Sequence, residues 1–101
     1  MSIENLSNRP TPVTTRQIKA ARALLGWSQE DLAERSAVSE PTIARLEAED
    51  GPLGGRPETV TKIVSAFVAA GIEFILENGG GPGVRLIKRI SIGPVTRGTG
   101  P

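Results

Sequence analysis

The 101-residue chain is 38 % hydrophobic but holds only one tryptophan and two phenylalanines, so it can build a single domain with a modest, aliphatic core. Because it contains neither cysteine nor histidine, disulfides, zinc-finger ligation and catalysis by a thiolate or an imidazole are excluded, and we expect no metal or other cofactor. The net charge of +1 does not by itself indicate a nucleic-acid partner.

The two ends of the chain differ from its centre. Residues 1–13 are polar and interrupted by proline, which predicts a flexible N-terminal arm, and residues 93–101 predict a flexible tail. Residues 14–71 carry seven basic and eight acidic side chains, whereas residues 83–101 carry four basic and no acidic ones. The longest apolar-rich run is too short to cross a bilayer and the N-terminus lacks the order of a signal peptide, so we expect a cytoplasmic protein with no membrane partner.

Local signals predict the first three helices. The first begins at Thr15 and should end at Gly26, a residue type that favours the left-handed conformation after a helix. The second starts after Ser28, because "SQED" is a capping box. The third follows the three-residue turn "AVS"; Ser39 should cap it, and Pro41 lies in its first turn, where no internal amide bond is lost.

A fourth helix is predicted from Pro57 to Ala70. Arg56 is a poor N-cap, so the first turn of this helix should be held weakly. An apolar stripe predicts the core-facing side of the helix: Val60, Ile63, Val64, Phe67 and Val68. Trp27, between the first two helices, is expected to plug the core rather than to stack on a base.

After Gly71 the pattern changes from helical to extended. The β-prone runs "IEFIL" and "VRLIKRI" are separated by the glycine-rich segment "ENGGGPG", which predicts an antiparallel hairpin within residues 72–92. One interpretation makes this hairpin a dimerisation element, because exposed strand edges pair readily. The alternative is an intramolecular hairpin that covers the fourth helix.

The second and third predicted helices form a familiar arrangement. Two short helices joined by a three-residue turn describe a helix-turn-helix, and Ala33 supplies the small residue needed where such helices cross closely. Four polar residues are left pointing away from the core: Gln29, Glu40, Thr42 and Arg45. We therefore expect a mainly α fold, in which a compact bundle of four to five helices over residues 14–71 contains the helix-turn-helix and precedes the β-hairpin.

The stretches "LGWSQEDLA" and "VSEPTIARLE" resemble the phage-repressor and Cro-like helix-turn-helix regulators, often called the XRE type, in both order and spacing. The resemblance extends over a little more than half of the chain. It implies a lambda-repressor-like bundle and a transcriptional regulator, often a repressor, that binds an operator in double-stranded DNA as a homodimer.

The resemblance also implies which residues meet DNA. Gln29 matches the position that clamps a phosphate beside the N-terminus of the second helix. The outward positions of the recognition helix, which meet base edges and backbone, are matched by Glu40, Pro41, Thr42 and Arg45, with the capping residue Ser39 at the same surface. Arg16 and Lys19 on the first helix are further candidates for phosphate contacts.

Other positions concern the fold rather than the reading of bases. Arg22 and Glu47 match a buried ion pair that ties the first helix to the end of the recognition helix in many family members. Two departures from the family pattern stand out. Ala37 occupies a turn position usually held by glycine, and "AEDG" is acidic where a phosphate contact is often made.

Several of the DNA-binding candidates have plainer interpretations. Arg45 could donate two hydrogen bonds to guanine or could pair with Glu49, four residues along the helix. Thr42 could contact a phosphate or a thymine methyl group, or could be a helix-surface hydroxyl. Glu40 could accept from a cytosine amino group or could complement the helix dipole.

Two classes of function compete on this fold. The first is a sequence-specific regulator whose third helix enters the major groove. The alternative is a protein-interaction module, such as the antitoxin of a toxin pair or a transcriptional adaptor, and the near-neutral helical region favours it slightly. We find no nucleophile with a base in reach, so no enzymatic activity or catalytic residue is expected.

Overall fold

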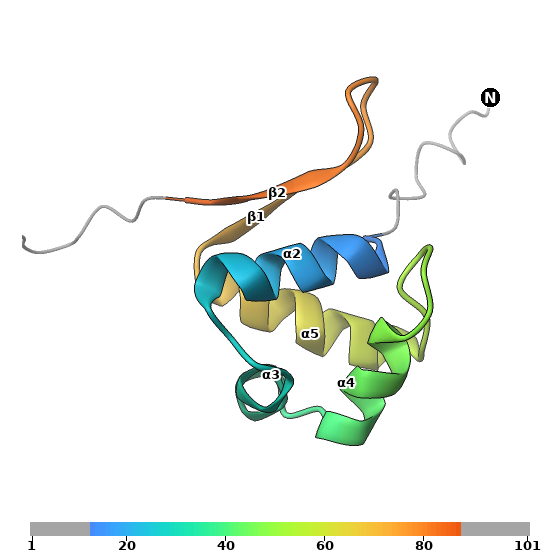
Figure 1. Ribbon diagram of the computed structural model, residues 1–101, viewed down its shortest axis with the longest axis vertical. Coiled ribbons are helices and arrows are strands. Elements are labelled where there is room, and N and C mark those ends of the chain that lie inside the picture. The colour runs from blue at the N-terminus through green and yellow to red at the C-terminus, as the bar shows by residue number, and fades with distance from the viewer. Residues whose placement is uncertain (1–12, 88–101) are drawn as a thin grey trace, which may run out of the picture.

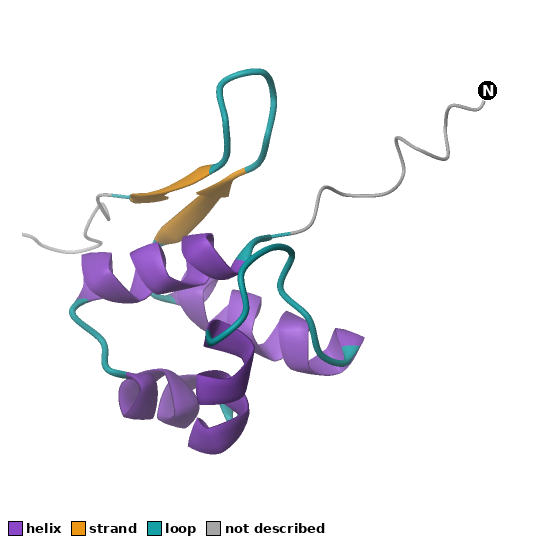
Figure 2. Ribbon diagram, turned by 45° about the vertical axis from the view of Figure 1, so that its right-hand side comes forward, coloured by secondary structure: helices purple, strands orange, loops and turns teal. Residues whose placement is uncertain are grey.

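A computed structural model describes residues 13–87 of the chain, and within this range four helices and a two-stranded hairpin form one bundle (Figures 1 and 2). The helices are α2 (Thr15–Leu25), α3 (Gln29–Ser36), α4 (Glu40–Glu47) and α5 (Pro57–Ala69), and the strands are β1 (Ile72–Ile75) and β2 (Gly83–Leu86). The hairpin lies along α2 and α5 on the side of the molecule away from α3 and α4. The predicted mainly α bundle with a C-terminal hairpin is confirmed.

The N-terminal caps explain where the helices begin. Thr14 and Gln17 form a capping box at the start of α2, and Ser28 and Asp31 form the predicted one before α3. Ser39 accepts a hydrogen bond from the backbone N–H of Thr42 at the start of α4. As expected, α5 begins at a proline and has no side-chain cap, because the arginine before it cannot accept from the backbone.

The core lies where α2, α3, α4 and α5 meet under the first strand. Its buried residues are Ile18, Ala21, Leu32, Val38, Ile43, Leu46, Leu53, Ile63, Phe67 and Ile72. Trp27 packs against this core with its ring stacked on that of Phe67, their centroids 5.5 Å apart, so its predicted role as a plug is confirmed.

One member of the predicted α5 stripe was assigned wrongly. Val68 is 56 % exposed, whereas Ile63 and Phe67 are fully buried. Successive helical residues are 100° apart, so the side that places Ile63 and Phe67 in the core turns Val68 toward solvent. Leu24, in the last turn of α2, is also 46 % exposed.

The hairpin is shorter than predicted over its described part. Its antiparallel register pairs Ile72 with Leu86 and Ile75 with Gly83, and the strands pack on α2 as well as on α5. The remainder of the predicted hairpin, residues 88–92, and the predicted tail, residues 93–101, lie outside the described residues. So does the predicted arm except for Val13, whose carbonyl accepts from the N–H of Leu53.

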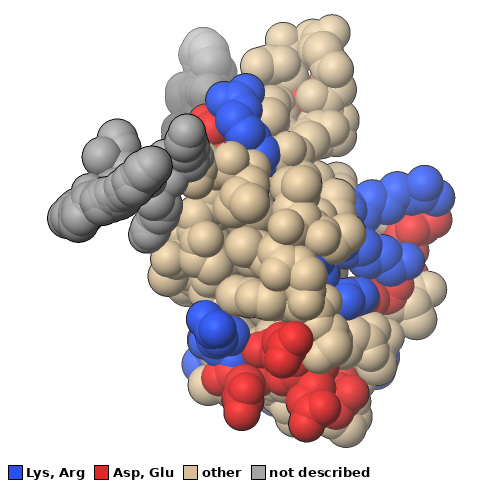
Figure 3. Space-filling model, turned by 60° about the vertical axis from the view of Figure 1, so that its left-hand side comes forward, with Lys and Arg blue, Asp and Glu red and all other residues tan. Residues whose placement is uncertain are grey.

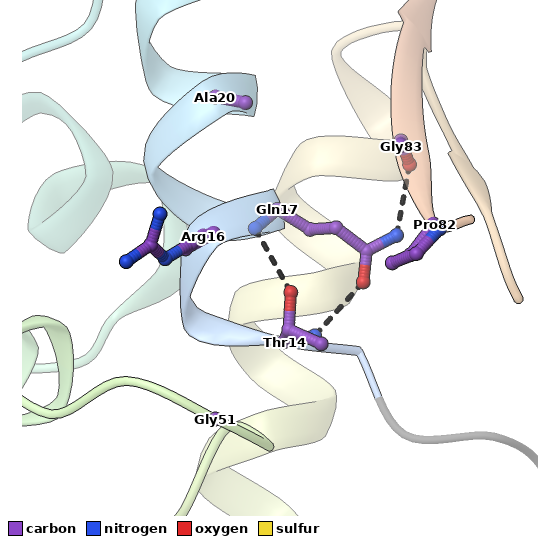
Figure 4. A pocket seen from close by; sticks show the side chains of 7 residues that line it. All are labelled: Thr14, Arg16, Gln17, Ala20, Gly51, Pro82 and Gly83. Carbon is purple, nitrogen blue, oxygen red and sulfur yellow. Dashed lines mark hydrogen bonds between the residues drawn. The ribbon is translucent and has the colours of Figure 1, made fainter.

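A buried amide fixes the hairpin against α2, and the sequence did not lead us to expect it. Gln17 is 3 % exposed; its Nε2 donates to the carbonyls of Ile75 and Gly83, at 3.0 and 2.8 Å. Its Oε1 accepts from the backbone N–H of Thr14 (Figure 4). One side chain therefore connects the N-terminus of α2 with the loop end of the two-stranded hairpin.

Candidate nucleic-acid interface

The turn between α3 and α4 sets the angle of the two helices. Ser36 Oγ donates to the carbonyl of Leu32 at 2.7 Å and accepts from the N–H of Val38, so its hydroxyl ties the end of α3 to the turn. Ala37 then adopts φ 63°, a left-handed conformation that favours glycine. For alanine this conformation costs roughly 1 kcal/mol. Ala37 therefore holds the backbone conformation for which glycine is the usual residue at this turn.

The outward face of α4 carries the residues predicted to read DNA. Glu40, Pro41, Ala44 and Arg45 are exposed and Thr42 is half-buried, while Ile43 and Leu46 point into the core. Within residues 13–87, Arg45 forms no ion pair with Glu49 or with any other carboxylate. The plainer interpretation of Arg45, a pair with Glu49, is therefore absent from the described structure.

A polar cleft of about 470 Å³ separates α4 from the start of α5. Thr42 and Arg45 line one wall, and Gly55, Arg56 and Thr59 line the other. Arg56 makes only a long contact of 3.8 Å to Glu58, with both side chains largely exposed, and such pairs hold a side chain weakly. The cleft thus brings two guanidinium groups, one from α4 and one from the residue before α5, to one polar surface.

Sequence reasoning missed Arg56 and Thr59 as candidate DNA contacts. Arg56 was noted only as a poor helix cap. The sequence feature that could have identified Arg56 is its position directly before Pro57, which begins the helix that follows the recognition helix. Only the packing of α5 beside α4 shows that this position faces Arg45 across the cleft.

The predicted buried ion pair between Arg22 and Glu47 is present. Arg22 Nη2 and Nε donate to the two carboxylate oxygens of Glu47 at 2.7 and 2.8 Å, and Nη1 donates to the carbonyl of Trp27. Glu47 is only 4 % exposed, and Gln29 Nε2 also donates to it at 3.0 Å. The carboxylate therefore connects α2, α3 and α4.

The electrostatics of this pair follow from its partners. Burial disfavours the charge on Glu47, but hydrogen bonds from Arg22 and Gln29 outweigh it and hold the pKa of the carboxyl below its ordinary value. The hydrogen bond with Glu47 likewise raises the pKa of Arg22. Gln29, predicted as a phosphate clamp, thus donates one of its two side-chain amide hydrogens to Glu47. The second amide hydrogen is not used in this bond.

Arg16 and Lys19 lie at the other end of α4. Together with Ala48 and Asp50 they line a hollow of about 540 Å³. Arg16 donates to both carboxylate oxygens of Asp50, at 3.3 and 3.0 Å, although both side chains are largely exposed. The hydrogen bond from Arg16, and then its charge, lowers the pKa of Asp50. The guanidinium of Arg16, which was predicted to contact phosphate, is thus already paired with the carboxylate of Asp50.

Charges are unevenly spread around the helix-turn-helix. Acidic side chains gather over α3, where Glu30 and Glu34 are exposed and Asp31 is half-buried (Figure 3). The basic candidates Arg45 and Arg56 lie at the cleft between α4 and α5. Phosphate contacts are therefore favoured on the α4–α5 side of the recognition helix and opposed along the outer face of α3.

The geometry defines a class of protein: a DNA-binding helix-turn-helix domain with an exposed recognition helix held by a buried ion pair. Residues 18–67 match the model of a helix-turn-helix family, and the chain belongs to the helix-turn-helix transcription regulators of the Cro-like, XRE type. A search of curated proteins gave no match.

Two further observations concern the part of the chain that the structure describes. No group of three or more acidic side chains is placed so that it could hold a metal ion. None of the helices between residues 13 and 87 has the length and apolar character needed to cross a membrane.

Proposed function

We propose that this DNA-binding protein is a sequence-specific repressor that acts in the cytoplasm and binds its operator as a homodimer. α4 would enter the major groove, and the N-terminal end of α3 would lie against phosphate. The observation that carries the proposal is the exposed face of α4, where Arg45 is left without a carboxylate partner among the described residues.

Individual roles follow from the hydrogen bonds already made. Ser39 Oγ donates to Thr42 Oγ1 at 2.9 Å, which leaves the hydrogen of the Thr42 hydroxyl available for a phosphate or a base. Gln29 keeps its second amide hydrogen for the phosphate beside α3. Glu40, at the first turn of α4, is placed to accept from a cytosine amino group.

Arg16 and Lys19 are the proposed phosphate contacts beyond the C-terminal end of α4. A DNA phosphate would have to replace the Asp50 carboxylate on Arg16, whereas Lys19 is exposed and forms no ion pair within the described residues. Arg56 and Thr59 extend the proposed backbone contact on the opposite side of Arg45.

Selection of bound duplexes from a random library tests the proposal directly. A homodimer of this class should enrich two inverted half-sites whose centres are about 34 Å apart on one face of the duplex. Recovery of no common sequence by the full chain at low salt would overturn sequence-specific binding.

The charge pattern also supports a second candidate, a protein-interaction module such as an antitoxin or an adaptor. The acidic surface over α3 and the Arg16–Asp50 pair both reduce attraction to DNA. Salt dependence separates the two candidates, because phosphate contacts make log K fall linearly with log salt concentration. Tight duplex binding with a steep slope supports the regulator, and no binding at low salt supports the interaction module.

A further inference from the structure

Large apolar side chains are exposed at one end of the molecule. Among residues 13–87 they are Leu24 (46 % exposed), Val68 (56 %), Leu86 (44 %) and Ile87 (46 %). They belong to the last turns of α2 and α5 and to the end of β2. We call these four residues the end surface.

Three of the four residues meet around Gly71, which joins α5 to β1. The N–H of Gly71 donates to the carbonyl of Val68 at 3.0 Å, and the N–H of Ile87 donates to the carbonyl of Gly71 at 2.7 Å. A δ-methyl group of Leu86 lies within ordinary contact distance of the position that a Cβ would take at Gly71. Val68, Leu86 and Ile87 are therefore neighbours in space.

Leu24 joins this group through the packing of α2 on β2. It follows Gln17 by seven residues, about two helical turns, so both lie on the side of α2 that faces the hairpin. Gln17 is bonded to Gly83, and α2 and β2 then run in the same direction (Figure 1). Seven helical residues and three strand residues both advance roughly 10 Å, which places Leu24 level with Leu86.

Among residues 13–87, the end surface carries no unbalanced charge of its own. Arg85, the charged residue of β2, donates to Glu73 on the paired strand at 3.1 Å. Figure 3, which turns this end forward, shows a broad uncharged area between the hairpin and the acidic side chains over α3. The described side chains of this surface therefore place no like charges against each other when a second copy approaches.

The adjoining edge of β2 is also open. The N–H of Ile87 donates to the carbonyl of Gly71, and the strand register then makes Glu73 and Arg85 a hydrogen-bonded pair. The backbone groups of Val84 and Leu86, on either side of Arg85, therefore point away from β1. Neither N–H has a partner within residues 13–87. An open edge of this kind is a template for pairing with another strand.

We infer that the end surface is the interface with a second copy of this chain. The inference rests on the proposed homodimeric function and names the surface that forms the dimer. A patch that is apolar, neutral and bordered by an open strand can be self-complementary about a two-fold axis. It lies at the hairpin side, so pairing leaves the α4 face exposed to DNA.

The four side chains can form only the centre of such an interface. A stable interface buries about 800 Å² on each partner, so the four side chains would supply its apolar core and the uncharged surface around them its rim.

Sedimentation of the full chain without DNA tests the interface. Wild type should sediment as a dimer, and the double variant Leu24→Glu/Leu86→Glu should sediment as a monomer with an unchanged far-UV spectrum. Gly54→Glu is the matched control: it adds the same kind of charge in the loop between α4 and α5, where an added side chain meets open space and which lies on the opposite side of the molecule from the end surface (Figure 1), and it should remain dimeric. A monomeric wild type, or a double variant that stays dimeric, would overturn the inference.

A second measurement uses the absence of cysteine from the chain. Leu86→Cys should form an intermolecular disulfide on mild oxidation and Gly54→Cys should not. Contact of the end surface with residues 88–101 of the same chain would give a monomer and no crosslink, which contradicts the inference.

Failure of the interface can be distinguished from failure of the proposed function. If the dimer forms but no duplex is bound, the DNA-binding proposal fails and the interface stands. If both hold, the monomeric variant should bind a duplex with two half-sites at least about 100-fold more weakly than wild type, because the linked second contact is lost. Its affinity for a single half-site should be little changed.

Discussion

Arg45 lies on the exposed face of α4 beside the polar cleft, and a guanidinium can donate two hydrogen bonds to the edge of guanine. We expect Arg45→Ala to weaken binding to the selected operator by about 1–3 kcal/mol, with a much smaller effect on unrelated duplexes. Arg45→Lys keeps the charge and removes the two-pronged donor, so it should lose most of the discrimination as well.

Gel-shift titrations at constant salt measure this effect, and Arg56→Ala is the matched control. A phosphate contact at Arg56 should weaken binding to all sequences about equally when it is removed. An Arg45→Ala variant that loses affinity equally for operator and unrelated DNA would show that Arg45 holds the backbone rather than a base.

Ala37 offers a stability test at the same scale. Because its φ of 63° is costly for alanine and easy for glycine, Ala37→Gly should raise the free energy of unfolding by up to about 1 kcal/mol. The matched control is Ala44→Gly, an exposed position inside α4, which should lower it by roughly 1 kcal/mol. Urea denaturation of both variants measures the difference, and two losses of equal size would contradict the explanation.

At the scale of elements, Glu47 links three helices and should make the fold sensitive to acid. Its folded-state pKa is lowered, so its stabilising contribution is present above the ordinary glutamate pKa of about 4.5 and is lost as pH falls through the lower folded-state value. Glu47→Gln should lower the free energy of unfolding by about 3 kcal/mol at pH 7, because it leaves Arg22 without its buried partner. Since the variant lacks the carboxylate, its stability should fall less than that of wild type when the pH is lowered.

Urea denaturation at pH 7 and pH 3 measures both effects. The matched control is Glu73→Gln, which breaks the largely exposed pair with Arg85 and should cost less than about 1 kcal/mol. If Glu47→Gln were as mild as Glu73→Gln, the ion pair would not be what joins α2 to α4.

The elements that could be predicted from sequence are those with signals within a few residues. Ser28, Ser39 and Gly26 mark helix ends by their own hydrogen bonds or conformation, so the helix-turn-helix was located correctly. The packing of the hairpin on α2 depends on Gln17, which is 58 and 66 residues away from its two carbonyl partners. No local pattern distinguishes such a glutamine from a surface residue, so this contact was missed.

The residues of the candidate nucleic-acid interface likewise include some that the sequence predicts and others that it does not. The outward residues of α4 follow from helical periodicity and the family motif, and their exposure is as expected. The pairing of Arg16 with Asp50 spans 34 residues, and the cleft residue Arg56 depends on how α5 packs beside α4. Both are set by tertiary packing, which a single sequence does not reveal.

For the whole molecule, the balance of charge is expected to limit the attraction to DNA. The chain carries a net charge of +1, and acidic side chains cover α3. Proteins that neutralise few phosphates have modest affinity and shallow salt dependence. The proposed homodimer would compensate by binding two half-sites at once, so oligomeric state and operator affinity should change together.

Asp50 is the carboxylate whose removal should change this balance most directly. Asp50→Asn releases Arg16 from its ion pair and leaves Arg16 and Lys19 beside the end of α4 without an adjacent carboxylate on that hollow. We expect tighter binding to all duplexes and a plot of log K against log salt that is steeper by about one unit for each additional phosphate that the protein neutralises.

The matched control is Glu77→Gln, which removes an exposed carboxylate in the hairpin loop; it changes the net charge equally but lies away from α4. Equal effects of the two substitutions would mean that total charge, rather than the release of Arg16, governs binding. A steeper slope for Asp50→Asn alone would show that the Arg16–Asp50 pair at the end of α4 reduces the affinity of the protein for DNA.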